Sequence, residues 1–121
     1  MSDIGSSLER TLKINGCLGA ALVDYESGMC LGTLGNPGFD LELAAAGNAD
    51  VVRAKFSIKE KIGVKDALED ILITLASQYH LIRMVGRSMF FYVVLDRTKA
   101  NLAMSRMEMN TIEKALEIDR T

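Results

Sequence analysis

The spacing of apolar residues changes several times along the chain, and each change marks the boundary of a predicted helix or strand. Three segments, residues 6–13, 40–59 and 98–118, carry apolar residues every three or four positions, which is typical of amphipathic helices. Ser6 followed by Glu9 has the capping-box pattern, so we expect the first helix to begin there. Asp40 is the expected N-cap of the middle helix.

The other apolar segments are short and are separated by turn-forming residues, and their expected strand ranges are 17–25, 29–34, 68–76, 79–85 and 89–96. The first two join at Glu26-Ser27-Gly28 as a β-hairpin, and the last three form a meander. The resulting order, α-β-β-α-β-β-β-α, fits an α+β fold in which helices pack on a five-stranded antiparallel sheet.

One predicted strand has a strongly apolar face. Within Ile71–Leu75, the residues Ile71, Ile73 and Leu75 alternate with Leu72 and Thr74. At the edge of a sheet, this strand exposes unpaired backbone groups beside apolar side chains, a combination that aggregates unless it is covered. Pairing with the same strand of a second copy satisfies the backbone and uses one patch from both chains. We therefore expect a homodimer.

The middle helix contains an unusual run of small residues, Ala44-Ala45-Ala46-Gly47. Small side chains allow another backbone to approach closely. The run is compatible with tight packing on the protein's own sheet and with packing against the same helix of a second copy. The sequence leaves both possibilities open.

Length and composition limit the classes of function. The chain has 121 residues, of which 49% are apolar, and this suits one domain over residues 1–121. Its net charge of −2 gives no basic footprint over the whole chain, so no nucleic-acid partner is expected. The apolar stretches are shorter than the roughly 18–20 residues that span a membrane, and the amino terminus lacks the apolar core of a signal peptide. We expect a cytoplasmic protein without membrane insertion.

Residues that could carry chemistry are few and isolated. His80 is the only histidine, and a half-buried, hydrogen-bonded strand residue is the expected role. Cys17 and Cys30 form no CxxC pair and lie in apolar strand contexts, which favours inert packing and a reducing setting. Glu69 and Asp70 are neighbours in a predicted strand and so point to opposite faces. We therefore predict no catalytic residue, no metal site, no cofactor and no enzymatic activity.

Several motifs in order resemble the roadblock/dynein light-chain domain family, in particular its actinobacterial branch. The first hairpin, the middle helix, the two strands after it and the entry to the last helix all contribute, and the resemblance extends from about Leu8 to Leu116. The segments that carry it are Gly19–Asp24, Ser27–Met29, Leu31-Gly32, Ala44–Asn48, Val51–Lys55, Glu69–Leu75, Gln78–Arg83, Leu95–Arg97 and Ala100–Ala103.

The resemblance implies a profilin-like fold with strand order 2-1-5-4-3 and helices on both faces, which places the Ile71–Leu75 strand at an edge. It also implies homodimers built from that strand and the middle helix. Family members regulate or scaffold small Ras-like GTPases, and those of the actinobacterial branch are commonly grouped with a sensor kinase-like protein and a small GTPase. Recruitment to the membrane through a partner is an open alternative. The domain itself has no active site in this family.

Two sets of residues follow as candidate sites. The expected dimer interface comprises Ala44, Ala45, Asn48, Val51, Val52, Glu69, Ile71, Ile73 and Leu75. The expected partner-binding residues are Asn48, Val52, Arg53 and Lys55. The leading hypothesis is a homodimeric GTPase regulator. A sensory ligand-binding module and a structural adaptor without effect on GTPase activity are the alternatives.

Overall fold

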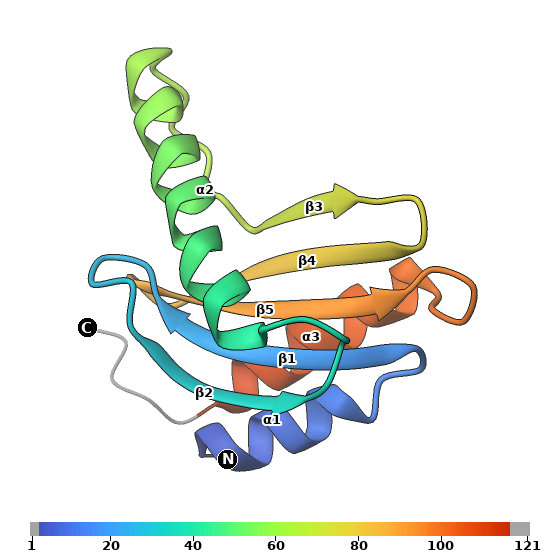
Figure 1. The fold of residues 1–121 in the computed structure, drawn as a ribbon. Coiled ribbons are helices and arrows are strands. Elements are labelled where there is room, and N and C mark those ends of the chain that lie inside the picture. The colour runs from blue at the N-terminus through green and yellow to red at the C-terminus, as the bar shows by residue number, and fades with distance from the viewer. Residues whose placement is uncertain (1–2, 117–121) are drawn as a thin grey trace.

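A computed structural model describes residues 3–116 as one sheet with helices on both of its faces (Figure 1). Its elements are α1 (Ile4–Leu12), β1 (Cys17–Asp24), β2 (Cys30–Gly35), α2 (Leu41–Lys61), β3 (Asp70–Thr74), β4 (Gln78–Val85), β5 (Met89–Asp96) and α3 (Leu102–Ala115). The five strands are antiparallel in the order β2-β1-β5-β4-β3. The predicted element order, strand order and α+β class are confirmed.

The central strands carry apolar side chains on both faces because both faces are covered. In β5, Phe91 and Val93 point to the layer of α1 and α3, whereas Phe90 and Tyr92 point to α2. A strand buried on both sides reads as a continuous apolar run rather than an alternating one. This accounts for the unbroken sequence Phe90–Leu95, whose residues are all buried.

Two helix starts differ from the sequence prediction. The first helix begins at Ile4, because Asp3 is its N-cap and its carboxylate accepts a hydrogen bond from the Ser6 backbone N–H at 2.8 Å. The capping box at Ser6 is therefore wrong, since Ser6 already lies inside the helix. The last helix begins at Leu102 rather than Thr98, because Asn101 caps it through the Met104 N–H. The predicted end at Ile118 lies outside the described residues.

The middle helix is longer than the sheet surface that it covers. Asp40 caps it as predicted, accepting from the Leu43 N–H at 3.0 Å, and the helix continues for 21 residues, or about 31 Å. All its buried residues lie within its first twelve positions, namely Leu41, Ala45, Ala49 and Val52. Figure 1 shows α2 crossing the strands and its carboxyl-terminal half projecting beyond β3.

Gly35, the last residue of β2, and Gly38, in the connection to α2, offer a matched test of the chain path. Gly35 and Gly38 both have positive φ angles, +93° and +90°, which only glycine adopts easily. A Cβ at Gly35 would lie 2.6 Å from the Leu18 carbonyl oxygen, whereas a Cβ at Gly38 meets nothing within 4 Å.

We expect Gly38→Ala to lower the free energy of unfolding by about 1–2 kcal/mol, the cost of a left-handed backbone alone. Gly35→Ala should cost at least about 1 kcal/mol more, because the β1–β2 backbone must also shift. Urea unfolding of both variants measures the difference. Equal losses would contradict the close approach at Gly35.

Candidate interaction surface

The strand β3 lies at an edge of the sheet and has only β4 as a hydrogen-bonded neighbour. At its two ends, the Met84 N–H donates to the Glu69 carbonyl at 3.0 Å and the Leu75 N–H donates to the Gln78 carbonyl at 2.9 Å. Antiparallel strands alternate between hydrogen-bonded and non-hydrogen-bonded residue pairs, so every second residue of β3 turns its backbone to β4. The N–H and C=O groups of the residues between them point outward, and these residues are Asp70, Leu72 and Thr74.

The side chains of β3 alternate between the two layers, as the sequence predicts. Ile71 and Ile73 pack against the core beneath α2, and Leu72 packs against the core beneath α1 and α3. Asp70 shares the face of Leu72, and its two carboxylate oxygens accept from Arg106 on α3 at 3.1 and 3.2 Å. This bidentate ion pair holds the first residue of the edge strand against α3.

Not all of the predicted surface residues of α2 lie on its surface. Ala45 and Val52 have no exposed area, because both pack on the sheet. Ala44 and Asn48 are half-buried, and Val51 is 39% exposed. At about 100° per residue, Ala44, Asn48 and Val51 share one flank of the helix, together with Lys55.

Arg53 lies on the other flank of α2. Its guanidinium donates to the carbonyl oxygen of Tyr25, at the end of β1, and to the carboxylate of Asp50. Of the four residues predicted to bind a partner, only Asn48 and Lys55 therefore share a surface. Glu69 and Leu75, from the predicted interface, are exposed just before and just after β3.

Sequence reasoning missed the apolar end of α2. Ile58 is 51% exposed and Ile62, just past the helix end, is 64% exposed. Both continue the flank of Val51 and Lys55, because positions 51, 55, 58 and 62 repeat at alternating spacings of four and three. This spacing is visible in the sequence and could have extended the predicted surface beyond Lys55.

The sheet surface beside this flank is partly open. His80 of β4 is half-buried there, and its ring stands edge-on to Tyr92 with the centroids 5.4 Å apart. Its Nδ1 lies 3.0 Å from the Tyr92 hydroxyl and its Nε2 lies 2.9 Å from Oε1 of Gln78. The predicted role of His80, a half-buried strand residue with hydrogen bonds, is confirmed.

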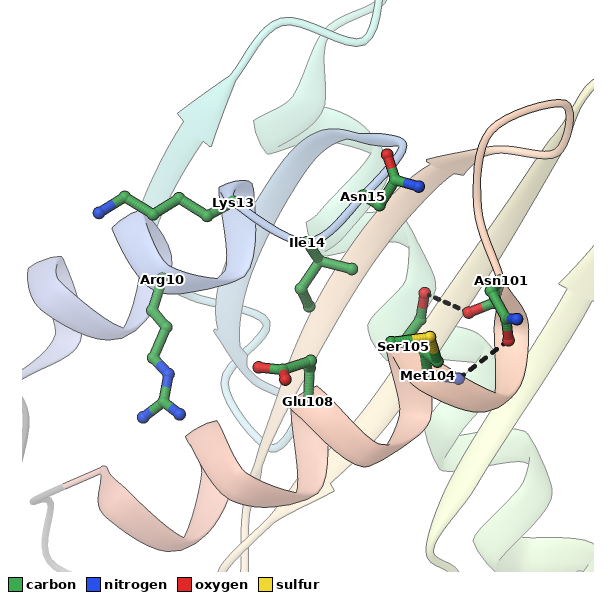
Figure 2. A pocket seen from close by; sticks show the side chains of 8 residues that line it. All are labelled: Arg10, Lys13, Ile14, Asn15, Asn101, Met104, Ser105 and Glu108. Carbon is green, nitrogen blue, oxygen red and sulfur yellow. Dashed lines mark hydrogen bonds between the residues drawn. The ribbon is translucent and has the colours of Figure 1, made fainter.

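A second surface feature is a groove between α1 and α3, on the opposite face of the sheet (Figure 2). Its volume is about 360 Å³, within the lower range of small-molecule sites. Only Ile14 and Ser105 among its lining residues are buried. Ser105 donates to the Asn101 carbonyl, and the Asn101 side chain caps α3, so these polar atoms already serve the helix.

The part of the chain that the structure describes contains no group of three or more histidine, cysteine, aspartate or glutamate side chains placed to hold a metal ion. Within that part, no helix combines the length and the apolar character needed to cross a membrane.

The two cysteines are placed as packing residues rather than nucleophiles. Burial raises the pKa of the Cys17 thiol to about 11 and also raises the pKa of the Cys30 thiol. Nucleophilic cysteines have the opposite shift, because the thiolate is the reactive form.

We expect both thiols to react slowly with iodoacetamide at about pH 8, because a raised pKa leaves little thiolate at that pH. With its pKa raised from 9.0 to about 11, Cys17 should hold about a hundredfold less thiolate than an exposed cysteine. The Cys30→Ser variant isolates Cys17, and urea-unfolded protein is the control. A native rate equal to the unfolded rate would refute the burial of Cys17.

Comparison with solved structures places this geometry among known folds, whereas neither protein-family models nor curated proteins give a match. Myxococcus xanthus MglB aligns with a TM-score of 0.80 and 19% identity over 90% of this chain and 87% of that chain. A Roadblock/LC7 domain from Streptomyces avermitilis aligns with a TM-score of 0.79 and 17% identity over 94% of both chains. A structure described as MglB with tetrameric arrangement aligns with a TM-score of 0.77 and 19% identity over 92% of this chain and 82% of that chain. The resemblance that the sequence motifs predict is thus confirmed in three dimensions: the chain has the Roadblock/LC7 fold.

Proposed function

We propose that the protein is a non-enzymatic homodimeric module that binds a small Ras-like GTPase and modulates its nucleotide cycle in a signalling system. The observation that carries the dimer is the continuity of two unsatisfied surfaces. The strand β3 turns unpaired backbone groups outward, and α2, which projects beyond β3 (Figure 1), carries exposed apolar residues on one flank and at its end. A second copy covers both at once.

The β3 strands of two copies can pair with each other so that each outward-facing residue has a partner. A twofold axis at Leu72 places Asp70 of each copy opposite Thr74 of the other. All the outward N–H and C=O groups of the strand then find partners. The same register places Ile71 opposite Ile73 on the α2 face, which gives apolar cross-strand pairs.

The helix α2 supports the same arrangement. Edge-to-edge pairing of two β3 strands about this axis puts both α2 helices on one face of a continuous sheet, side by side and antiparallel. Because α2 projects beyond β3, its end then lies over the sheet of the second copy (Figure 1). Ile58 and Ile62 of one copy become covered there by the other copy. Small residues such as Gly47 of the other copy leave room for them, because a Cβ at Gly47 would meet nothing within 4 Å.

The GTPase as partner rests on the resemblance to the roadblock family and on the shared fold. The similarity to MglB with tetrameric arrangement supports self-association of this fold. A non-enzymatic role agrees with thiols of raised pKa and with a histidine that is engaged in structural hydrogen bonds. Such a module acts by positioning groups that belong to the GTPase.

A sensory ligand-binding module is the second candidate, and the groove between α1 and α3 is the observation that favours it. Native mass spectrometry of protein purified from its source tests this candidate. A stoichiometric small molecule that Met104→Trp displaces from the groove supports it.

Replacing Ile73 with Glu should abolish the dimer, because each of two carboxylates must then enter an apolar strand interface. We expect the dimer Kd to rise at least about a hundredfold, which corresponds to roughly 2.7 kcal/mol. Sedimentation velocity measures the association. Thr33→Glu, an exposed substitution in the other edge strand β2, is the matched control and should leave the dimer intact. A wild-type monomer at micromolar concentration would refute the pairing.

Immobilised protein should capture a Ras-like GTPase encoded beside it, with different affinities for the GTP- and GDP-loaded forms. Arg53→Ala, on the flank of α2 that the second copy leaves open, should weaken capture while sedimentation still shows a dimer, and Lys114→Ala on α3 should have no effect. Hydrolysis and exchange rates with and without the protein separate a regulator from a structural adaptor. If neither the GTP-loaded nor the GDP-loaded form is captured, the proposal of a GTPase partner is refuted.

A further inference from the structure

A short chain of polar side chains crosses the otherwise apolar layer between α2 and the sheet. It begins at Gln78 and His80 of β4, continues through the hydroxyl of Tyr92 on β5 and ends at Asn48 on α2. Asn48 is itself tied to its helix, because its side-chain amide donates to the Ala44 carbonyl at 2.8 Å. The chain thus links the sheet to the flank of α2 that faces the second copy in the proposed dimer.

The hydrogen bonds of this chain fit a neutral imidazole. Oε1 of Gln78 can only accept, so Nε2 of His80 carries the proton and donates to it. The other ring nitrogen, Nδ1, is then the acceptor, and the hydroxyl of Tyr92 donates to it. A proton added at Nδ1 turns this acceptor into a donor, so the Tyr92 hydroxyl must turn to accept from the ring and can no longer donate to it.

The surroundings of His80 offer no counter-charge for a protonated ring. The groups that face it are Gln78 from β4, Tyr92 from β5 and Phe39 from the β2–α2 connection, whose ring centroid is 5.8 Å away. Across the β3–β4 ladder, His80 is paired with Ile73. Tyr92 is the titratable group among these, and burial raises its pKa to about 12, so its hydroxyl stays neutral near pH 7.

His80 is half-buried in the single chain, and the proposed dimer buries it further. It lies on the face that receives the projecting end of the second copy's α2, beside Ile73 of the pairing strand. Burial already lowers the pKa of His80 in the single chain. Covering by the apolar Ile58 and Ile62 of a second copy removes more water from the ring and disfavours its charged form further.

We propose that His80 makes self-association depend on pH: its neutral ring holds Tyr92 and Asn48 in place beneath the second copy's α2, and its protonation releases the second copy. This inference rests on the homodimer proposed above. The dimer binds fewer protons than two separate chains, so association weakens as the pH falls. The dimer Kd should begin to rise below the ordinary histidine pKa of about 6.5, because separate chains then begin to take up protons at His80.

The test measures the dimer Kd by sedimentation between about pH 5 and pH 8, with histidine as the group that titrates in this range. Because a twofold dimer contains two copies of His80, the Kd should rise by up to about a hundredfold per pH unit below the histidine pKa. His80→Asn is the matched variant, because its amide oxygen takes the place of Nδ1 and accepts from Tyr92 without titrating. Its Kd should stay constant over the same range.

A wild-type Kd that is constant with pH, or a His80→Asn variant with the wild-type pH dependence, would overturn the inference. A second readout distinguishes this failure from failure of the dimer itself. Amide hydrogen exchange in residues 44–52 of α2 should accelerate when His80 is protonated, and the NMR titration of its ring gives the pKa. If sedimentation finds monomers at every pH, the dimer is refuted, and unchanged exchange refutes the role of His80 separately.

Discussion

The open edge of the sheet is the constraint on which the rest of this structure depends. A strand that has a neighbour on one side only leaves every second pair of backbone groups unsatisfied, and in β3 these groups lie beside apolar side chains on both faces. The helix α2 extends past this edge (Figure 1), and Ile58 and Ile62 near its end stay more than half exposed in the single chain.

The residues of α2 fall into two stripes at different angles around the helix axis. One stripe, Leu41, Ala45, Ala49 and Val52, packs on the sheet. The adjacent flank, from Ala44 to Ile62, faces outward along the strands. Among the small residues at positions 44–47, Ala45 packs on the sheet, which is one of the two roles that the sequence leaves open, whereas Gly47 is exposed.

The residue pattern was sufficient for the order of helices and strands, because turn residues and changes of spacing mark every element, whereas the strand order β2-β1-β5-β4-β3 was predicted only from the family resemblance. The pattern within β3 also predicted the correct faces for Ile71 and Ile73. Helix starts were harder, since Asp3 caps from before the first periodic segment and Asn101 caps from inside the last one. The exposure of individual α2 residues could not be predicted, because it depends on where the helix crosses the sheet. Val52 and Arg53 are neighbours in sequence, yet one is in the core and the other reaches back to Tyr25.

The ion pair between Asp70 and Arg106 joins the two sides of the molecule. Asp70 belongs to the edge strand and turns its backbone outward. Its carboxylate accepts two hydrogen bonds from Arg106 of α3, which lies on the face of the sheet opposite α2. The position of α3 therefore sets the position of the first residue that a neighbouring strand would meet. Through this contact the edge strand on one side of the sheet and the helix that lines the groove share an ion pair.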